Sequence, residues 1–236
     1  MKKIILLFVF FVTVSLTAQR MAFSVVEIKA KPHTQKDIVK AFTDTYEGVE
    51  MNQGGIVLER MGNGRTNGAT HRVVFMWTLG VRMMAEDAIS EDKNSVLWAK
   101  MGNFVEEWGA EYSGRILSWQ EGDTDKNSNV HIWDVKIDDP NLFKAGHDKI
   151  VEKYKEDFSG RVVGFGTYDI GRPNGASHWV ALSGKNKNDH MMLYDKLQKD
   201  AKFIQLIQER GPVEDVKDYE IKILKRFQLA QLPRRY

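Results

Sequence analysis

Cysteine is absent from the 236-residue chain, and proline is scarce, with five residues in all. Without cysteine the chain can form no disulfide and can carry no lipid on an N-terminal cysteine, so its stability must come from a hydrophobic core. The sequence also lacks the motifs His-Glu-x-x-His, Gly-x-Ser-x-Gly and Cys-x-x-Cys and the phosphate-binding Walker loop. These absences exclude the enzyme classes that are easiest to recognise from sequence.

A single long apolar run stands at the N-terminus. Residues 1–18 join Lys2 and Lys3 to the apolar stretch 4–16 and end on Ala18. This pattern predicts a secretory signal peptide cut after Ala18, and hence a periplasmic or secreted bacterial protein. The alternative, an N-terminal membrane anchor, needs about 20 apolar residues, more than this run provides. Removal of the segment takes the formal charge from +2 to zero, so we expect no nucleic-acid binding and no stable membrane insertion afterwards.

The chain contains an internal repeat. The eight residues from Gly64, Gly-Arg-Thr-Asn-Gly-Ala-Thr-His, return from Gly171 as Gly-Arg-Pro-Asn-Gly-Ala-Ser-His, 107 positions later. The same offset relates Glu27 to Asp134. Because the register persists across most of each half, we interpret the chain as a duplication of one structural unit.

Each copy is predicted to contain a strand, a helix, two strands around a glycine-rich loop, a second helix and a last strand. Helical spacing and capping residues predict the first helices, which begin near Thr34 and Asp139. The second helices are predicted to be continuous, over 97–108 and 193–207. The expected strands after the first of each copy are 54–61, 71–77 and 113–119, then 162–170, 178–183 and 219–227.

This element order is that of the ferredoxin-like βαββαβ unit, in the α+β class. Helices cover one face of its sheet, so the open faces of two tandem units can pack together. The pattern resembles the dimeric α+β barrel superfamily, which includes the antibiotic-biosynthesis-monooxygenase-like and NIPSNAP-like families, here as an intramolecular pseudo-dimer. The units are expected at 20–121 and 130–229, with a linker at 122–129 and a tail at 230–236.

The resemblance implies a cleft between sheet and helices, where the monooxygenase families bind aromatic or haem substrates. Their catalytic asparagine, tryptophan and histidine find no matching positions in this chain, so no activity is carried over. Strand alternation places His71 on the same face as Trp77, toward the helices, and His178 likewise. Both histidines are therefore the candidate catalytic residues, and Trp77 is a candidate ligand-binding residue.

The repeated loops supply candidate ligand-binding residues, Arg65, Asn67, Arg172 and Asn174. The structural alternative, which we favour, is that Asn-Gly forms a turn with positive φ, the arginines are solvated, and each histidine bonds a neighbouring strand.

Glu27 and Asp134 are further candidate ligand-binding residues. Strand alternation places their side chains on the face opposite the histidines, between the two sheets. In a dry interior such acids can have a raised pKa and transfer protons. The alternative is that Lys29 and Lys136, two residues further on, neutralise them. The opposite faces argue against a direct Glu–His dyad.

Two functions of different classes remain. The first is binding or transformation of a small apolar or aromatic molecule in a sheet–helix cleft, with one apolar cleft in each half and His71 and His178 as the polar groups. The second is a non-catalytic envelope or secreted platform for a protein or glycan partner. No cofactor is expected, and no metal, because the other histidines lack partners at a ligand spacing. A closed pocket would favour the first function and an exposed apolar patch the second.

Overall fold

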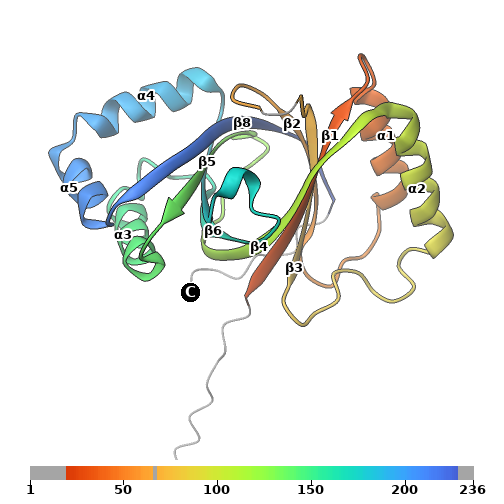
Figure 1. The fold of residues 1–236 in the computed structure, drawn as a ribbon, viewed down its shortest axis with the longest axis horizontal. Helices are drawn as coiled ribbons and strands as arrows, with labels where there is room; N and C mark the ends of the chain where they lie inside the picture. The colour runs from red at the N-terminus through yellow and green to blue at the C-terminus, as the bar shows by residue number, and fades with distance from the viewer. Residues whose placement is uncertain (1–19, 66–67, 228–236) are drawn as a thin grey trace, which may run out of the picture.

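The computed structural model describes residues 20–65 and 68–227, so the predicted signal peptide, Asn67 and the tail 230–236 lie outside the described residues. Within this part of the chain, eight strands close into one antiparallel barrel, and five α-helices lie outside it. Figure 1 shows the helices in two groups on opposite sides of the barrel. None of these helices has the length and apolar character needed to cross a membrane.

The order of elements confirms the predicted α+β duplication. The first unit consists of β1 (Met21–Ala30), α1 (Gln35–Tyr46), β2 (Gly55–Met61), β3 (His71–Thr78), α2 (Glu91–Phe104) and β4 (Val105–Gln120). The second consists of β5 (Asn129–Ile137), α3 (Pro140–Lys153), β6 (Val163–Ile170), β7 (His178–Gly184), α4 (Lys187–Gln198), α5 (Ala201–Glu209) and β8 (Val213–Phe227), with a short 3₁₀ turn at Pro173–Gly175.

The barrel is built from two four-stranded sheets of the same internal order. Around its circumference the strands follow β1-β3-β2-β8-β5-β7-β6-β4. Each unit thus keeps its last strand beside its first, and the units join where β2 pairs with β8 and β4 pairs with β6. The two open sheet faces therefore meet inside the barrel, as the dimeric α+β barrel predicts.

Strand alternation sorts the apolar residues into an inner core and outer layers. On β1, Phe23 and Val25 point into the barrel and join residues of both units, whereas Ile28 packs under α1 and α2. The second unit has the same separation, with Trp179 and Ala181 inside and Leu182 under the helices. Each sheet is consequently buried on both faces.

The second helices differ from the prediction. The helix expected over 97–108 ends at Phe104, and Val105 already belongs to β4, where it pairs with Ala30 while Trp108 pairs with Ile28. The helical spacing of these residues is overridden by their pairing with β1. The last strands are accordingly longer than predicted.

The helix expected over 193–207 is two helices. Asp200 separates them, and its carboxylate accepts hydrogen bonds from the backbone N–H groups of Lys202 and Phe203, at 2.8 and 3.3 Å, to cap α5. Asp139 caps α3 as predicted. At α1 Thr34 is the N-cap residue as predicted, but its side chain does not cap the helix, because the hydroxyl donates backward to the carbonyl of Lys31.

Candidate functional site

The repeated loops join the two units. Gly64 and Gly171 have φ angles of 74° and 67°, in the left-handed region that favours glycine. A Cβ on Gly64 would lie 2.2 Å from the carbonyl oxygen of Asp218 in β8, and one on Gly171 would lie 2.3 Å from that of Glu111 in β4. Each loop therefore packs against the last strand of the other unit, which explains why both copies keep the motif.

The remaining described loop residues also have structural roles. Asn174 has a φ of 52°, as the predicted turn requires, and the side chain of Arg172 donates to the carbonyl of Tyr168 at 3.2 Å. Arg65 is exposed. These observations support the structural interpretation of the loop, and a ligand-binding role for these residues stays a prediction.

His71 and His178 occupy equivalent buried positions on the helix-facing side of β3 and β7, as predicted. Each Nδ1 lies near the hydroxyl of the preceding residue, 2.9 Å from Thr70 and 2.7 Å from Ser177. The Thr70 hydroxyl also accepts a hydrogen bond from the backbone N–H of Ala30 at 2.8 Å, so it links the end of β1 to the imidazole of His71.

The two imidazoles differ at Nε2. That of His71 lies 3.4 Å from Gln35 at the start of α1, whereas that of His178 has no partner among the described residues and its ring stacks on Phe165. Burial lowers the pKa of His71 to about 4 and lowers that of His178, so both are neutral near pH 7. Their catalytic role stays a prediction. Trp77 is half-buried on β3, in register with Ala22.

Glu27 and Asp134 point into the barrel, on the face opposite the histidines, as predicted. The Tyr112 hydroxyl donates to Glu27 at 3.2 Å and the Tyr168 hydroxyl donates to Asp134 at 2.7 Å. Burial raises the pKa of Asp134 to about 6, the shift expected of an acid in a dry interior, and its role in proton transfer stays a prediction.

The alternative of neutralised Glu–Lys and Asp–Lys neighbours is wrong. Lys29 pairs with Glu106 and Lys136 pairs with Glu214, both at 2.7 Å. The lysines pair with acids of the neighbouring last strands, since the barrel interior holds the acids while the lysines stay partly exposed.

A cleft of about 640 Å³ opens in the second unit between its sheet and helices α3, α4 and α5. One wall is aromatic: the ring centroids of His131 and Trp133 are 3.9 Å apart, and Tyr194 bonds His131 at 2.8 Å. His147 on α3 lies deeper, with an Nε2 that is buried and unpartnered among the described residues. Burial lowers the pKa of His147 to about 4, so its imidazole is neutral.

Arg210 brings a positive charge to this cleft. Its guanidinium lies 4.8 Å above the ring of Phe143, a cation–π contact. Gly146 permits this position, because a Cβ there would lie 2.4 Å from Cβ of Arg210.

The corresponding space in the first unit is filled. Trp98 of α2 packs against Phe42 of α1 and Phe75 of β3, with ring centroids 6.2 and 6.4 Å apart. The prediction of similar histidine-lined clefts in both halves is therefore wrong. The residues lining the second-unit cleft include His131 and His147 rather than His178, and His71 lies in a surface pocket of about 390 Å³ beside Arg60.

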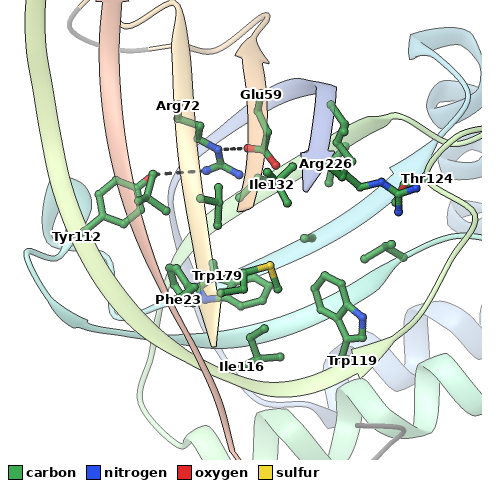
Figure 2. Close-up of a pocket in the computed structure, with 18 of the residues that line it drawn as sticks. Phe23, Glu59, Arg72, Tyr112, Ile116, Trp119, Thr124, Ile132, Trp179 and Arg226 are labelled. Atoms are coloured by element: carbon green, nitrogen blue, oxygen red, sulfur yellow. Dashed lines mark hydrogen bonds and ion pairs between the residues drawn. The ribbon is translucent and has the colours of Figure 1, made fainter. Parts of the chain in front are cut away.

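A cavity of about 120 Å³ lies inside the barrel (Figure 2). At one end Arg72, which is buried, pairs with Glu59 and donates to the Tyr219 hydroxyl at 2.8 Å. Burial opposes the charge of Arg72, but Glu59 and the nearby tyrosines outweigh it and raise the pKa of the guanidinium. The other walls are mainly apolar, with Phe23 packed edge-on against Trp179 at 5.6 Å.

Sequence reasoning did not identify Glu59, Arg72 or the tyrosines as members of one cluster. The available signal was a charged residue inside an otherwise apolar strand, His71–Thr78, on the parity opposite His71. Across the part of the chain that the structure describes, no group of three histidine, aspartate or glutamate side chains is arranged to hold a metal ion.

No protein-family model matches the sequence, and no curated protein matches it significantly. Solved structures do match its fold. A candidate monooxygenase from Fusobacterium nucleatum has 15% identity and a TM-score of 0.56, over 93% of this chain and 98% of that one. A candidate monooxygenase from Lactobacillus acidophilus has 10% identity and a TM-score of 0.53, over 89% and 95%. An anthrone oxidase-like protein has 7% identity and a TM-score of 0.53, over 91% and 95%. The chain thus has the dimeric α+β barrel fold, with both halves of the barrel in one polypeptide.

Proposed function

We propose that this protein binds a small, mainly apolar molecule in the cleft of its second unit. The observation that carries the proposal is the cleft itself, about 640 Å³ between a sheet and three helices, in a place where the first unit is filled by Trp98. A pocket of this size suits a drug-sized ligand. A recessed cleft of this volume also favours small-molecule binding over the alternative of a platform for a protein or glycan.

The polar groups of the cleft indicate how such a molecule would be oriented. The wall of His131, Trp133 and Tyr194 suits a flat aromatic ring. His147 offers an unpartnered imidazole nitrogen, and Arg210 offers positive charge to an acidic group of the ligand. Fold neighbours described as candidate monooxygenases are compatible with a small organic ligand.

Export is part of the proposal, supported by the signal-like pattern of residues 1–18. N-terminal sequencing of the protein from its host's envelope or medium tests it, and a chain that retains Met1 would contradict it.

The fluorescent probe 1-anilinonaphthalene-8-sulfonate, an aromatic sulfonate, tests the cleft. Ile204 of α5 lines the cleft and is 44% exposed, so Ile204→Trp should obstruct the site without disturbing the core. We expect at least tenfold weaker probe binding. Ile170→Trp, at a 71% exposed position outside the cleft, is the matched control and should bind like the parent protein. Equal affinity in both variants, with thermal unfolding unchanged, would refute the cleft as the binding site.

A further inference from the structure

The barrel interior has two unlike walls at equivalent positions of the duplication. Arg72 in the first unit corresponds to Trp179 in the second, and Trp119 of β4 corresponds to Arg226 of β8. All four side chains line the interior cavity. One wall therefore presents two indoles where the other presents two guanidiniums, and Figure 2 shows Trp119 and Trp179 on the opposite side of the cavity from Arg72.

Two glycines of β6 make room for the indoles. A Cβ on Gly164 would lie 2.9 Å from the ring of Trp119, and one on Gly166 would lie 2.5 Å from the ring of Trp179. The equivalent first-unit residues are Val57 and Glu59. Gly164 and Gly166 of β6 thus leave a backbone surface without side chains, and two aromatic side chains pack against it. The first unit does not share this feature.

Three buried polar atoms of the residues that line this cavity have no hydrogen-bond partner among the described residues. They are the indole Nε1 of Trp119, the indole Nε1 of Trp179 and the hydroxyl of Thr124, all buried. An indole N–H can only donate. A buried donor without an acceptor is costly, so a guest that supplies an acceptor oxygen would be favoured here.

The charges of the cavity are already matched. Arg72 pairs with Glu59, and Arg226 pairs with Asp125 at 2.9 Å. Among the described residues that line the cavity, no charged side chain is left without an opposite charge to attract an ion, so the geometry favours a neutral acceptor over a carboxylate.

Size and access limit the guest further. The volume of about 120 Å³ is close to that of an engineered cavity, about 150 Å³, that admits benzene. Thr124, Ile223 and Arg226 line both the cavity and an open surface pocket beside the linker. A single-ring molecule could enter at this end of the barrel.

We propose that the barrel interior is a second binding site, for a single-ring molecule with a neutral carbonyl oxygen. The ring packs against Trp119 and Trp179, and the oxygen accepts from an indole N–H. This site is separate from the second-unit cleft, because the two lie on opposite faces of the sheet.

Indole resonances of the full chain labelled with ¹⁵N-tryptophan test the proposal directly. Acetophenone is the probe, and α-methylstyrene, which replaces the carbonyl oxygen by a methylene group, is its matched control. We expect acetophenone to shift the indole N–H signal of Trp119 or Trp179 and to bind about tenfold more tightly than α-methylstyrene. Trp98, on the outer side of the sheet, should not respond.

The variants Trp119→Phe and Trp179→Phe keep a ring but remove the N–H, and assign the signals. Together they should bring the affinity ratio of the two probes close to one, whereas Trp98→Phe should leave it unchanged. A shift confined to Trp133 would place acetophenone in the second-unit cleft and overturn the barrel site while supporting the cleft. Equal affinities of the two probes, or no shift at millimolar acetophenone, would also overturn it.

Discussion

At the scale of single residues, the barrel interior is unusual in the charge it encloses. Arg72 and Glu59 form a buried ion pair, and Tyr112 and Tyr168 each donate to a carboxylate. Buried pairs of this kind stabilise a fold only when their remaining hydrogen-bonding groups are also satisfied. Here Tyr219 accepts from the guanidinium, so the arginine is held by more than one partner.

Asp134 should make stability depend on pH. Its pKa of about 6 in the folded protein exceeds the ordinary value of 3.8, so between these values the folded state holds a proton that the unfolded state has lost. The stabilisation from this group is complete below about pH 4 and is lost as the pH rises through about 6, a change of about 3 kcal/mol.

The variant Asp134→Asn keeps an acceptor for Tyr168 but cannot titrate. Relative to the parent protein, we expect its free energy of unfolding to improve steadily as the pH rises from about 4 to 7. Urea unfolding at several pH values measures this difference, and subtraction of the parent curve removes the opposite contributions of His71 and His147. A difference that does not change with pH would show that Asp134 is ionised in the folded protein.

At the scale of elements, the repeated loops hold the last strands in place. The contact is reciprocal, since Gly62 donates to the carbonyl of Glu220 at 2.6 Å and Glu220 donates to that of Asn63 at 2.9 Å. The loop between β2 and β3 and the loop between β6 and β7 thus each connect the two units where their sheets pair.

Gly171→Ala should be strongly destabilising. It combines a positive φ with a Cβ 2.3 Å from the carbonyl oxygen of Glu111, so we expect a loss of about 3 kcal/mol or more in the free energy of unfolding. Gly175→Ala is the control in the same loop: its φ is 79°, but no atom lies within 4 Å of the added Cβ, so it should cost only about 1 kcal/mol. Equal losses in urea unfolding would mean that the contact with β4 contributes nothing.

The sequence predicted the elements where local pattern and tertiary environment agree. The repeat and strand alternation placed His71 and His178 toward the helices and Glu27 and Asp134 inside. The prediction failed at Val105, where pairing with β1 outweighs helical spacing. It also failed near Asp200, where a capping residue divides the expected helix into two.

The site was less predictable than the fold. The second-unit cleft depends on Trp98 filling one half and on Gly146 admitting Arg210 in the other, and both are contacts between distant elements. The interior cavity depends on residues from all eight strands and the linker. No residue spacing along the chain encodes such contacts, although the single arginine in the otherwise apolar strand β3 was a sign of a buried charge beside this cavity.

At the scale of the whole molecule, each unit depends on the other to pair its edge strands and to cover its inner sheet face. Separation would expose the edges of β2 and β4 in the first unit and of β6 and β8 in the second. It would also uncover the interior core, which draws on both units. Unpaired edges promote association.

Residues 20–121 and 122–236, produced as separate chains, should therefore each self-associate, and together they should form a 1:1 complex. The backbone pairing of β2 with β8 and of β4 with β6 supplies the reason. Sedimentation velocity of each chain and of the mixture measures it. A first unit that stays monomeric at 0.1 mM, with its urea midpoint equal to that of the intact chain, would contradict this expectation.

The covalent connection of the halves also frees the interior from strict twofold symmetry. In a homodimer of the first unit, every substitution would occur twice, so Arg72 would place two guanidiniums and two Glu59 carboxylates around the same axis. Here the first unit has Arg72, whereas the second unit has Trp179 packed against the glycines of β6. Because the two halves are encoded in one chain, each can differ from the other, and an asymmetric chamber is the result.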